Sequence, residues 1–341
     1  MKTKVIKLTN TVLRIGIVLL SLWFLYYHLI HKQGFTEFVR QLNPFTFGPT
    51  QQGLFFLALL LMPFNLGLEA IKWKLLIDKL EKVKFNRAFT AVLSGISVSM
   101  LMPNRIGDYL GRVFILQKGS LIKGVLVTLI GSMSQLLTTL IAGCIAFAFS
   151  FHLFIDFDFS HSTGLTIGLL SLVFSILFFL VTLYFNVGLL KFLAEAVFKG
   201  KSKKLLQYIA VFSEYKRIEL FQILFLSVLR YFIFSYQFYL LILVFGFQCS
   251  YFEGLLLISL SYLFLTIIPT IALTELSVRG SVAIYLFGLY FAGNPDWVTS
   301  GVNAVFGASS VLWLINLGIP AILGVIFVYR LRFVRKDNDA G

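Results

Sequence analysis

Cysteine, histidine, proline and acidic residues are all scarce in this chain, which has 2 Cys, 4 His, 7 Pro and 15 Asp or Glu among its 341 residues. The cysteines, Cys144 and Cys249, give neither a disulfide framework nor the spacing of a metal site. The histidines have no metal-ligand spacing either, so we expect no bound metal. The chain also lacks a phosphate-binding Gly-Lys-Ser/Thr loop, a nucleophile elbow and a dinucleotide fingerprint. We therefore expect no cofactor and no energy from bound nucleotide.

Charged residues are scarce as well, at 13% of the chain, whereas hydrophobic residues make up 58%. This balance excludes a water-soluble globule. Apolar runs of about 20 residues recur along the sequence, and each is long enough to cross a hydrocarbon core of about 30 Å as a helix. We therefore expect an all-α bundle that forms a single transmembrane domain over residues 1–341.

The charge that is present is mostly basic, with 29 Lys or Arg and a net charge of +14. Nucleic acid is not the expected partner, because most basic residues gather in five clusters between apolar segments. The alternate loops carry acidic residues such as Asp156 and Asp296. By the positive-inside rule, the basic loops face the cytoplasm and its anionic lipids. We expect a multi-pass protein of the inner cell membrane with both termini cytoplasmic. The clusters span residues 2–14, 72–87, 118–123, 191–217 and 330–336.

Six segments are predicted to cross the membrane fully. They are Val12–Ile30, Leu54–Ile71, Gly124–Ser150, Leu165–Val187, Leu220–Phe247 and Gly301–Tyr329.

Two further apolar regions, about 88–117 and 254–292, have loops of the same charge type at both ends. The first region should begin and end inside, and the second should begin and end outside. Each is therefore predicted to be a re-entrant helical hairpin, broken near Pro103 in the first and near Pro269 in the second. Opposed hairpins of this kind are typical of inverted-repeat transporters. The alternative is that both regions are simple full crossings.

The first hairpin carries charges at a depth where an unpaired charge is costly. Arg105, Asp108 and Arg112 are spaced i, i+3 and i+7, which predicts one helix face with two cations flanking an anion. Asn104 is expected to cap that helix, whose N-terminus suits a phosphate oxygen. The alternatives are an ion-pair cluster that only braces the hairpin and an ordinary cytoplasmic turn.

The second hairpin has a pair of charges beyond its break. Glu275 and Arg279 are four residues apart and are expected to pair along a helix. If the hairpins meet, Arg279 joins Arg105 and Arg112 around one polar cavity, where the three arginines would hold a lipid phosphate. Asp108 and Glu275 would orient the arginines and are the candidates for proton coupling. The alternative is a lone ion pair at a helix interface.

Two more charges lie at membrane depth. Glu69 is expected either to pair with Lys72 or Trp73 near the cytoplasmic end of its helix or to touch substrate. Arg230 lies deeper in its segment. It either neutralises one of the three carboxylates or contributes to the anion site.

Three short motifs resemble the lysylphosphatidylglycerol synthase transmembrane-region family, which is also called flippase-like. The run Pro103-x-Arg105-x-Gly107-Asp108-x-x-x-Arg112 resembles its signature. Asn65, Glu69 and Lys72-Trp73 resemble its first conserved helix end, and Pro269 through Val278-Arg279-Gly280-Ser281 resembles its second motif. The resemblance implies movement of anionic, aminoacylated or polyprenyl-linked lipids between leaflets. Some members are instead tied to glycan assembly on dolichol.

The chain departs from the bifunctional members of that family, because it lacks their soluble aminoacyl-transferase domain. It is therefore not expected to synthesise lysyl-lipid. It also has Thr-Ile-Ala-Leu-Thr-Glu, residues 270–275, where many members have a glycine-rich stretch.

The sequence thus favours a lipid flippase that is not an enzyme, with membrane lipids as partners and cell-envelope biosynthesis enzymes as candidate protein partners. One alternative is an enzyme or accessory subunit in lipid-linked glycan assembly, which would use the same arginines to bind a pyrophosphate. Another is a scaffold or regulator of cell-envelope synthesis that transports nothing.

Overall fold

The computed structural model describes residues 47–100, 102, 105–117, 120–150, 163–188, 207–268 and 272–328. Every regular element in these ranges is helical, which confirms the all-α prediction for the described part of the chain. The predicted crossing Val12–Ile30 lies outside the described residues, as do Pro103 and Pro269 at the predicted hairpin breaks.

Four helical runs in the described part are long and apolar enough to cross a membrane. With 28 to 30 residues each, they extend about 42 to 45 Å at 1.5 Å per residue. They coincide with four of the predicted crossings, and the 23-residue α7 (Thr163–Phe185) coincides with a fifth. The total number of crossings stays a prediction. The four runs are α3 (Pro49–Ile77), α6 (Leu121–Ser150), α10 (Arg217–Val244) and the continuous run of η5 (Trp297–Gly301), α13 (Val302–Trp313), η6 (Leu314–Gly318) and α14 (Ile319–Val325).

Local hydrogen bonds fix where two helices begin. The short helix η4 (Ala210–Glu214) precedes α10, which starts where the Lys216 amide donates to Glu219 Oε2 at 2.8 Å. The helix α11 (Tyr251–Ile267) starts with a reciprocal capping box. In that box the Ser250 amide donates to Glu253 Oε2 at 2.9 Å, and the Glu253 amide donates to Ser250 Oγ at 3.3 Å.

Each region predicted as a hairpin is two helices with a break between them. The first holds α4 (Phe85–Ser99) and α5 (Ile106–Val113), and the second holds α11 and α12 (Ala272–Tyr290). With 15 and 8 residues, α4 and α5 reach only about 22 and 12 Å, too short to cross a membrane. With 17 and 19 residues, α11 and α12 reach about 26 and 29 Å, longer than half-helices. Entry of the hairpins from opposite faces stays a prediction.

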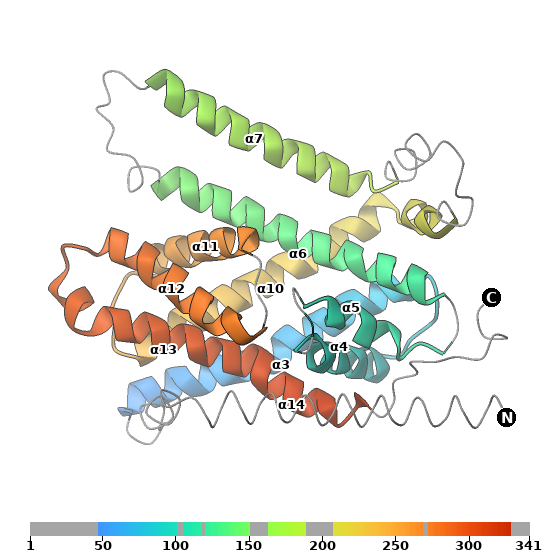
Figure 1. Ribbon diagram of the computed structural model, residues 1–341, viewed down its shortest axis with the longest axis horizontal. Helices are drawn as coiled ribbons and strands as arrows, with labels where there is room; N and C mark the ends of the chain where they lie inside the picture. The colour runs from blue at the N-terminus through green and yellow to red at the C-terminus, as the bar shows by residue number, and fades with distance from the viewer. Residues whose placement is uncertain are drawn as a thin grey trace.

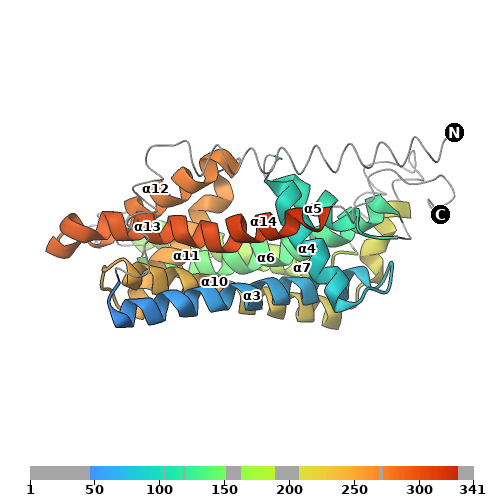
Figure 2. The same ribbon diagram turned by 90° about the horizontal axis from the view of Figure 1, so that it is seen from below.

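Both helix pairs are antiparallel. Gly95 in α4 lies against Gly111 in α5, so close that a Cβ atom on Gly111 would lie 2.7 Å from Gly95 Cα. In the other pair, Tyr290 Oη at the end of α12 donates to Glu253 Oε1 at the start of α11, at 3.3 Å. The two pairs occupy opposite ends of the bundle, with α4 and α5 near α14 (Figures 1 and 2).

The apolar core is divided between the two ends of the bundle. One cluster joins α4 and the start of α6 and α10 to the end of α3, around Trp73, Leu116 and Leu220. The other joins α11, α12 and α13 to the end of α10, around Phe247 and Phe287. Most of the charged groups discussed below lie between these clusters, where α3, α5, α6, α10 and α12 approach one another (Figure 1).

Candidate functional site

The inner face of α3 supplies the first polar groups of the site. Asn65, Glu69 and Lys72 are spaced i, i+4 and i+7, which places them on one face of the helix. All three are buried, so this face of α3 points into the bundle and away from lipid. The indole of the adjacent Trp73 donates to Thr128 Oγ1 of α6 at 3.1 Å and fixes the helix next to α6.

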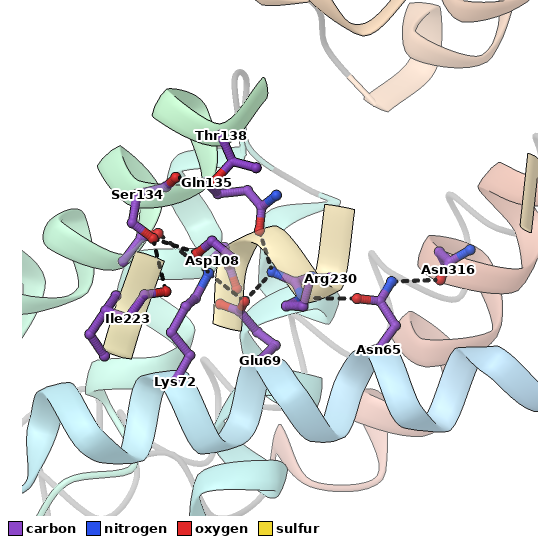
Figure 3. Close-up of polar contacts among 12 residues, drawn as sticks. Asn65, Glu69, Lys72, Asp108, Ser134, Gln135, Thr138, Ile223, Arg230 and Asn316 are labelled. Atoms are coloured by element: carbon purple, nitrogen blue, oxygen red, sulfur yellow. Dashed lines mark hydrogen bonds and ion pairs between the residues drawn. The ribbon is translucent and has the colours of Figure 1, made fainter. Parts of the chain in front are cut away.

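Glu69 is the counter-ion for three cations. Its Oε2 accepts from Lys72 Nζ at 2.8 Å and from Arg230 of α10, and its Oε1 accepts from Arg112 of α5. Figure 3 shows Glu69 between Lys72 and Arg230, with Arg230 linked in turn to Asn65. The pairing with Lys72 was one of the two predicted roles. Arg230 therefore neutralises the Glu69 carboxylate, which was one of the two roles predicted for this arginine.

Asp108 and Arg112 form a bidentate pair along α5. Arg112 Nε donates to Asp108 Oδ1 at 2.8 Å, and Arg112 Nη2 donates to Asp108 Oδ2 at 2.6 Å. Together with the bond to Glu69, this engages Nε, Nη1 and Nη2 of the buried Arg112. Bidentate, charge-assisted bonds of this kind are among the strongest that arginine makes. All three nitrogen atoms of the Arg112 guanidinium group thus bond to Asp108 or Glu69.

Arg105 does not share a helix face with Asp108 and Arg112, so the i, i+3, i+7 argument is wrong for this residue. Its backbone is left-handed, with φ 56° and ψ 24°, and α5 begins only at Ile106. The side chain points to the other hairpin, where its Nη2 donates to Glu275 Oε1 at 2.6 Å. Asn104, predicted as the helix cap, lies outside the described residues, and Arg105 itself occupies the cap position.

Glu275 holds an arginine from each hairpin. Arg279 Nε donates to Glu275 Oε1 at 2.8 Å, which is the predicted pairing along α12. The same carboxylate also accepts from Arg105, so it joins residues 170 positions apart in the sequence. Because Glu275 is buried, it can hold both guanidinium groups in fixed positions. The hairpins therefore meet through this three-residue cluster.

One central cavity of about 380 Å³ collects these groups. Five cations line it, together with Glu69 and Asp108, and Glu275 lies directly behind Arg105 and Arg279. Five positive and three negative charges leave this cluster with a net charge of +2, so it is complementary to an anion. The cations are Lys72, Arg105, Arg112, Arg230 and Arg279. The structure thus brings Arg105, Arg112 and Arg279 to one cavity, as expected if the hairpins meet.

The arginines differ in how freely they face the cavity. The exposed fraction of the side chain is 44% for Arg105 and 21% for Arg279, but only 7% for Arg112. The ion pairs of Arg105 and Arg279 use Nε and Nη2, and within the described part of the chain Nη1 of each makes no hydrogen bond. Arg105 is therefore the arginine that faces the cavity most freely, followed by Arg279 and by Arg230 of α10, whose side chain is 20% exposed.

Several polar residues of the site, among them Asn65, Lys72, Gln135 and Asn316, were not assigned to it from the sequence. Lys72 was counted in a cytoplasmic cluster, but it is buried and lines the cavity. Gln135 accepts from Arg230 Nη1 at 3.2 Å, and Asn316 Oδ1 accepts from Asn65 Nδ2 at 3.1 Å (Figure 3). The signal that could have found Lys72 is its i+3 spacing from Glu69 on the inner face of α3.

The described residues contain no group of three or more His, Cys, Asp or Glu side chains placed to hold a metal ion.

A bundle of long apolar helices around a buried cavity of paired charges defines a polytopic α-helical membrane protein. Residues 11–274 match the family model described as the lysylphosphatidylglycerol synthase TM region, so the chain belongs to that family. The match ends one residue before Glu275, and the place of Glu275 and Arg279 in the site therefore rests on the contacts described above. No curated protein and no solved structure matches the chain significantly.

Proposed function

We propose that this protein is a lipid flippase, which moves an anionic, aminoacylated or polyprenyl-linked lipid between membrane leaflets. The observation that carries the proposal is the central cavity with its net charge of +2, to which each hairpin contributes a partly exposed arginine. Inside an apolar bundle, a charged cavity of about 380 Å³ offers a lipid phosphate polar surroundings that the hydrocarbon core does not.

The arginines divide into two roles in this proposal. Arg105 and Arg279 bind the phosphate through their Nη1 groups, while Glu275 keeps both guanidinium groups aimed at the cavity. Arg112 supplies positive charge from the cavity wall and is held by Asp108. When the lipid leaves, the carboxylates still compensate these cations, so the empty cavity does not contain uncompensated arginines.

The pairing of the carboxylates supports transport over catalysis on a lipid-linked glycan. An enzyme of that kind needs a carboxylate free to act as a base or to hold a metal. Glu69, Asp108 and Glu275 each form an ion pair with at least one arginine. We further propose the inner cell membrane as the location, with both termini cytoplasmic, membrane lipids as the main partners and cell-envelope enzymes as protein partners.

Reconstitution tests the proposal. In proteoliposomes with fluorescent phosphatidylglycerol or phosphatidylcholine, the wild-type protein should move the anionic lipid faster. Arg105→Ala and Arg279→Ala should each abolish that difference, because each removes a cation exposed to the cavity.

Arg217→Ala is the matched control for this experiment. Arg217 lies at the start of α10 and donates to Asn186 Oδ1 at 2.9 Å in an exposed position. Its removal should leave transport at the wild-type rate. Unchanged transport in both cavity variants would overturn the proposal, and formation of a product from a lipid-linked sugar would favour the enzyme instead.

A further inference from the structure

A second, apolar groove lies between α6, α10 and α11. It has a volume of about 310 Å³, and its walls are almost entirely hydrocarbon. Its lining includes Ile145 and Phe149 of α6, Leu224 and Phe232 of α10, and Phe252 and Leu256 of α11. Several of these side chains are exposed, Phe149 to 63% and Phe252 to 61%, so the groove opens on the outside of the bundle.

The groove lies next to the charged cavity, and Tyr231 separates the two. A third cavity, of about 280 Å³, is lined by Arg105 and Arg279 together with Tyr231. Tyr231 also lines the apolar groove, whereas both arginines also line the central cavity. The three cavities are therefore neighbours: the third overlaps the central cavity at the arginines and shares the Tyr231 side chain with the groove.

Tyr231 is fixed at the junction of the polar and apolar parts. Its hydroxyl donates to Ser259 Oγ of α11 at 2.7 Å, and its ring packs edge-on against Tyr262 with centroids 6.0 Å apart. These contacts hold the ring between α10 and α11. A tyrosine with one polar end and one apolar face suits the part of a lipid where headgroup and chain join.

We propose that the groove binds one hydrocarbon chain of the same lipid whose phosphate binds Arg105 and Arg279. The inference rests on the proposed function and adds that the chain occupies a site on the protein while the headgroup is bound. The groove supplies apolar walls and shares Tyr231 with a cavity that Arg105 and Arg279 line, so an anionic amphiphile is the occupant that fits both. A second protein chain would not account for the arginine-lined cavity beside the groove.

The position of the groove indicates where the chain enters. Phe149 is the penultimate residue of α6, and Phe252 is the second residue of α11. Their rings lie edge to face with centroids 6.1 Å apart. The groove thus extends from the middle of the bundle toward the end that carries the start of α11, opposite the end where α3 meets α4 (Figure 1). The lipid chain would enter from the leaflet at that end.

Photo-crosslinking in proteoliposomes tests this placement. The probes are phosphatidylglycerol and phosphatidylcholine, each with a diazirine at the end of one acyl chain, and the labelled peptides are mapped by mass spectrometry. Any lipid that surrounds the protein will label exposed helices such as α7, whose Phe174 and Phe178 face outward. The α7 peptide therefore reports contact with bulk lipid.

The expected result is a preference for the anionic probe at the groove peptides and none at the α7 peptide. That preference should be lost in Arg279→Ala, because the chain is held in the groove only when the headgroup is held at the arginines. Equal labelling of the groove by both probes in the wild-type protein would overturn the inference, since the groove would then contact bulk lipid alone.

A groove-filling variant separates this inference from the proposed function. Ala142 lines the groove, whereas Ala148, on the same helix, is exposed outside it. Ala142→Phe should lose both the labelling preference and transport, and Ala148→Phe should keep both. If the arginine variants stop transport while Ala142→Phe retains wild-type labelling and transport, the chain site is wrong and the flippase proposal stands. If the arginine variants transport normally, the flippase proposal itself fails.

Discussion

At the scale of single residues, Glu69 determines whether the central charges can be buried at all. It accepts from Lys72, Arg112 and Arg230, three cations that come from three different helices. A buried ion pair adds little net stability over an apolar pair, but removing one partner typically costs about 3 to 5 kcal/mol, because a buried charge loses its compensation. The loss of this carboxylate affects three cations at once.

We therefore predict that Glu69→Gln strongly destabilises the protein, by about 3 kcal/mol or more. The matched control is Glu219→Gln, because Glu219 pairs with Lys79 at 2.6 Å where both side chains are 32% exposed. Exposed pairs contribute about 1 kcal/mol at most, so the control should unfold close to the wild-type temperature. Thermal unfolding in detergent, followed by intrinsic fluorescence, measures both. Equal unfolding temperatures for the two variants would contradict the role of Glu69.

The sequence predicted most of the charged residues of the site but only some of their pairings. Arg105, Arg112 and Glu69 could be identified because they are charged residues in apolar segments of the sequence. The i, i+4 spacing predicted the pair between Glu275 and Arg279. The partner of Arg105 could not be predicted, because a left-handed residue just before α5 turns its side chain away from the helix face that spacing assigned to it. Backbone conformation in a break between helices has no periodic signal in the sequence.

At the scale of helices, glycines bring α4 and α5 into backbone contact. A Cβ atom at Gly111 would lie 2.7 Å from Gly95 Cα and 3.0 Å from Ser94 O. Neither is the end of a flexible side chain, so the two helices would have to separate. This contact places Asp108 and Arg112, on the same short helix, beside the end of α3.

We predict that Gly111→Ala destabilises the hairpin by about 1 to 3 kcal/mol and weakens transport, because it displaces Arg112 from Glu69. Gly67→Ala is the control, since a Cβ at this position of α3 meets nothing within 4 Å. Alanine favours a helix by up to about 1 kcal/mol over glycine, so the control should be as stable as wild type or more stable. Unfolding temperatures and transport rates of both variants provide the measurement. A Gly111→Ala protein with wild-type values would show that the helices can separate freely.

Helix positions followed more directly from the sequence than helix pairing did. Long apolar runs predicted α3, α6, α10 and the last helical run, because length and hydropathy alone decide whether a helix can cross a membrane. The breaks in both hairpin regions were also predicted. The sequence did not predict that the two hairpins differ in length. Loop charges indicate on which side a segment begins and ends, but they do not fix the lengths of the helices within it.

At the scale of the whole molecule, the two ends of the bundle differ in charge. The described helix ends around the turn from α3 to α4 and the start of α10 carry many basic residues. The opposite end, around the turns from α10 to α11 and from α12 to η5, carries Glu253 and Asp296 and has no Lys or Arg at residues 245–250 or 291–296. No local pattern predicts that both hairpins meet at the centre, since the contact between Arg105 and Glu275 spans 170 positions.

This asymmetry predicts opposite labelling of the two ends, because the end rich in lysine and arginine should face the cytoplasm. Lys82, in the turn from α3 to α4, and Thr299, in η5, are both exposed, and these two segments lie at opposite ends of the bundle (Figure 1). In intact spheroplasts, a membrane-impermeant maleimide should label Thr299→Cys at once and Lys82→Cys only after permeabilisation.

The native cysteines contribute little background to that experiment. Burial, together with the nearby Glu253 carboxylate, raises the pKa of the Cys249 thiol to about 11. Because the thiolate is the reactive form, Cys249 should react slowly at neutral pH compared with an exposed thiol of ordinary pKa. A variant in which alanine replaces Cys144 and Cys249 serves as the background. Labelling of both introduced cysteines from the same side would contradict the topology, and with it the leaflet from which a lipid chain is proposed to enter the groove.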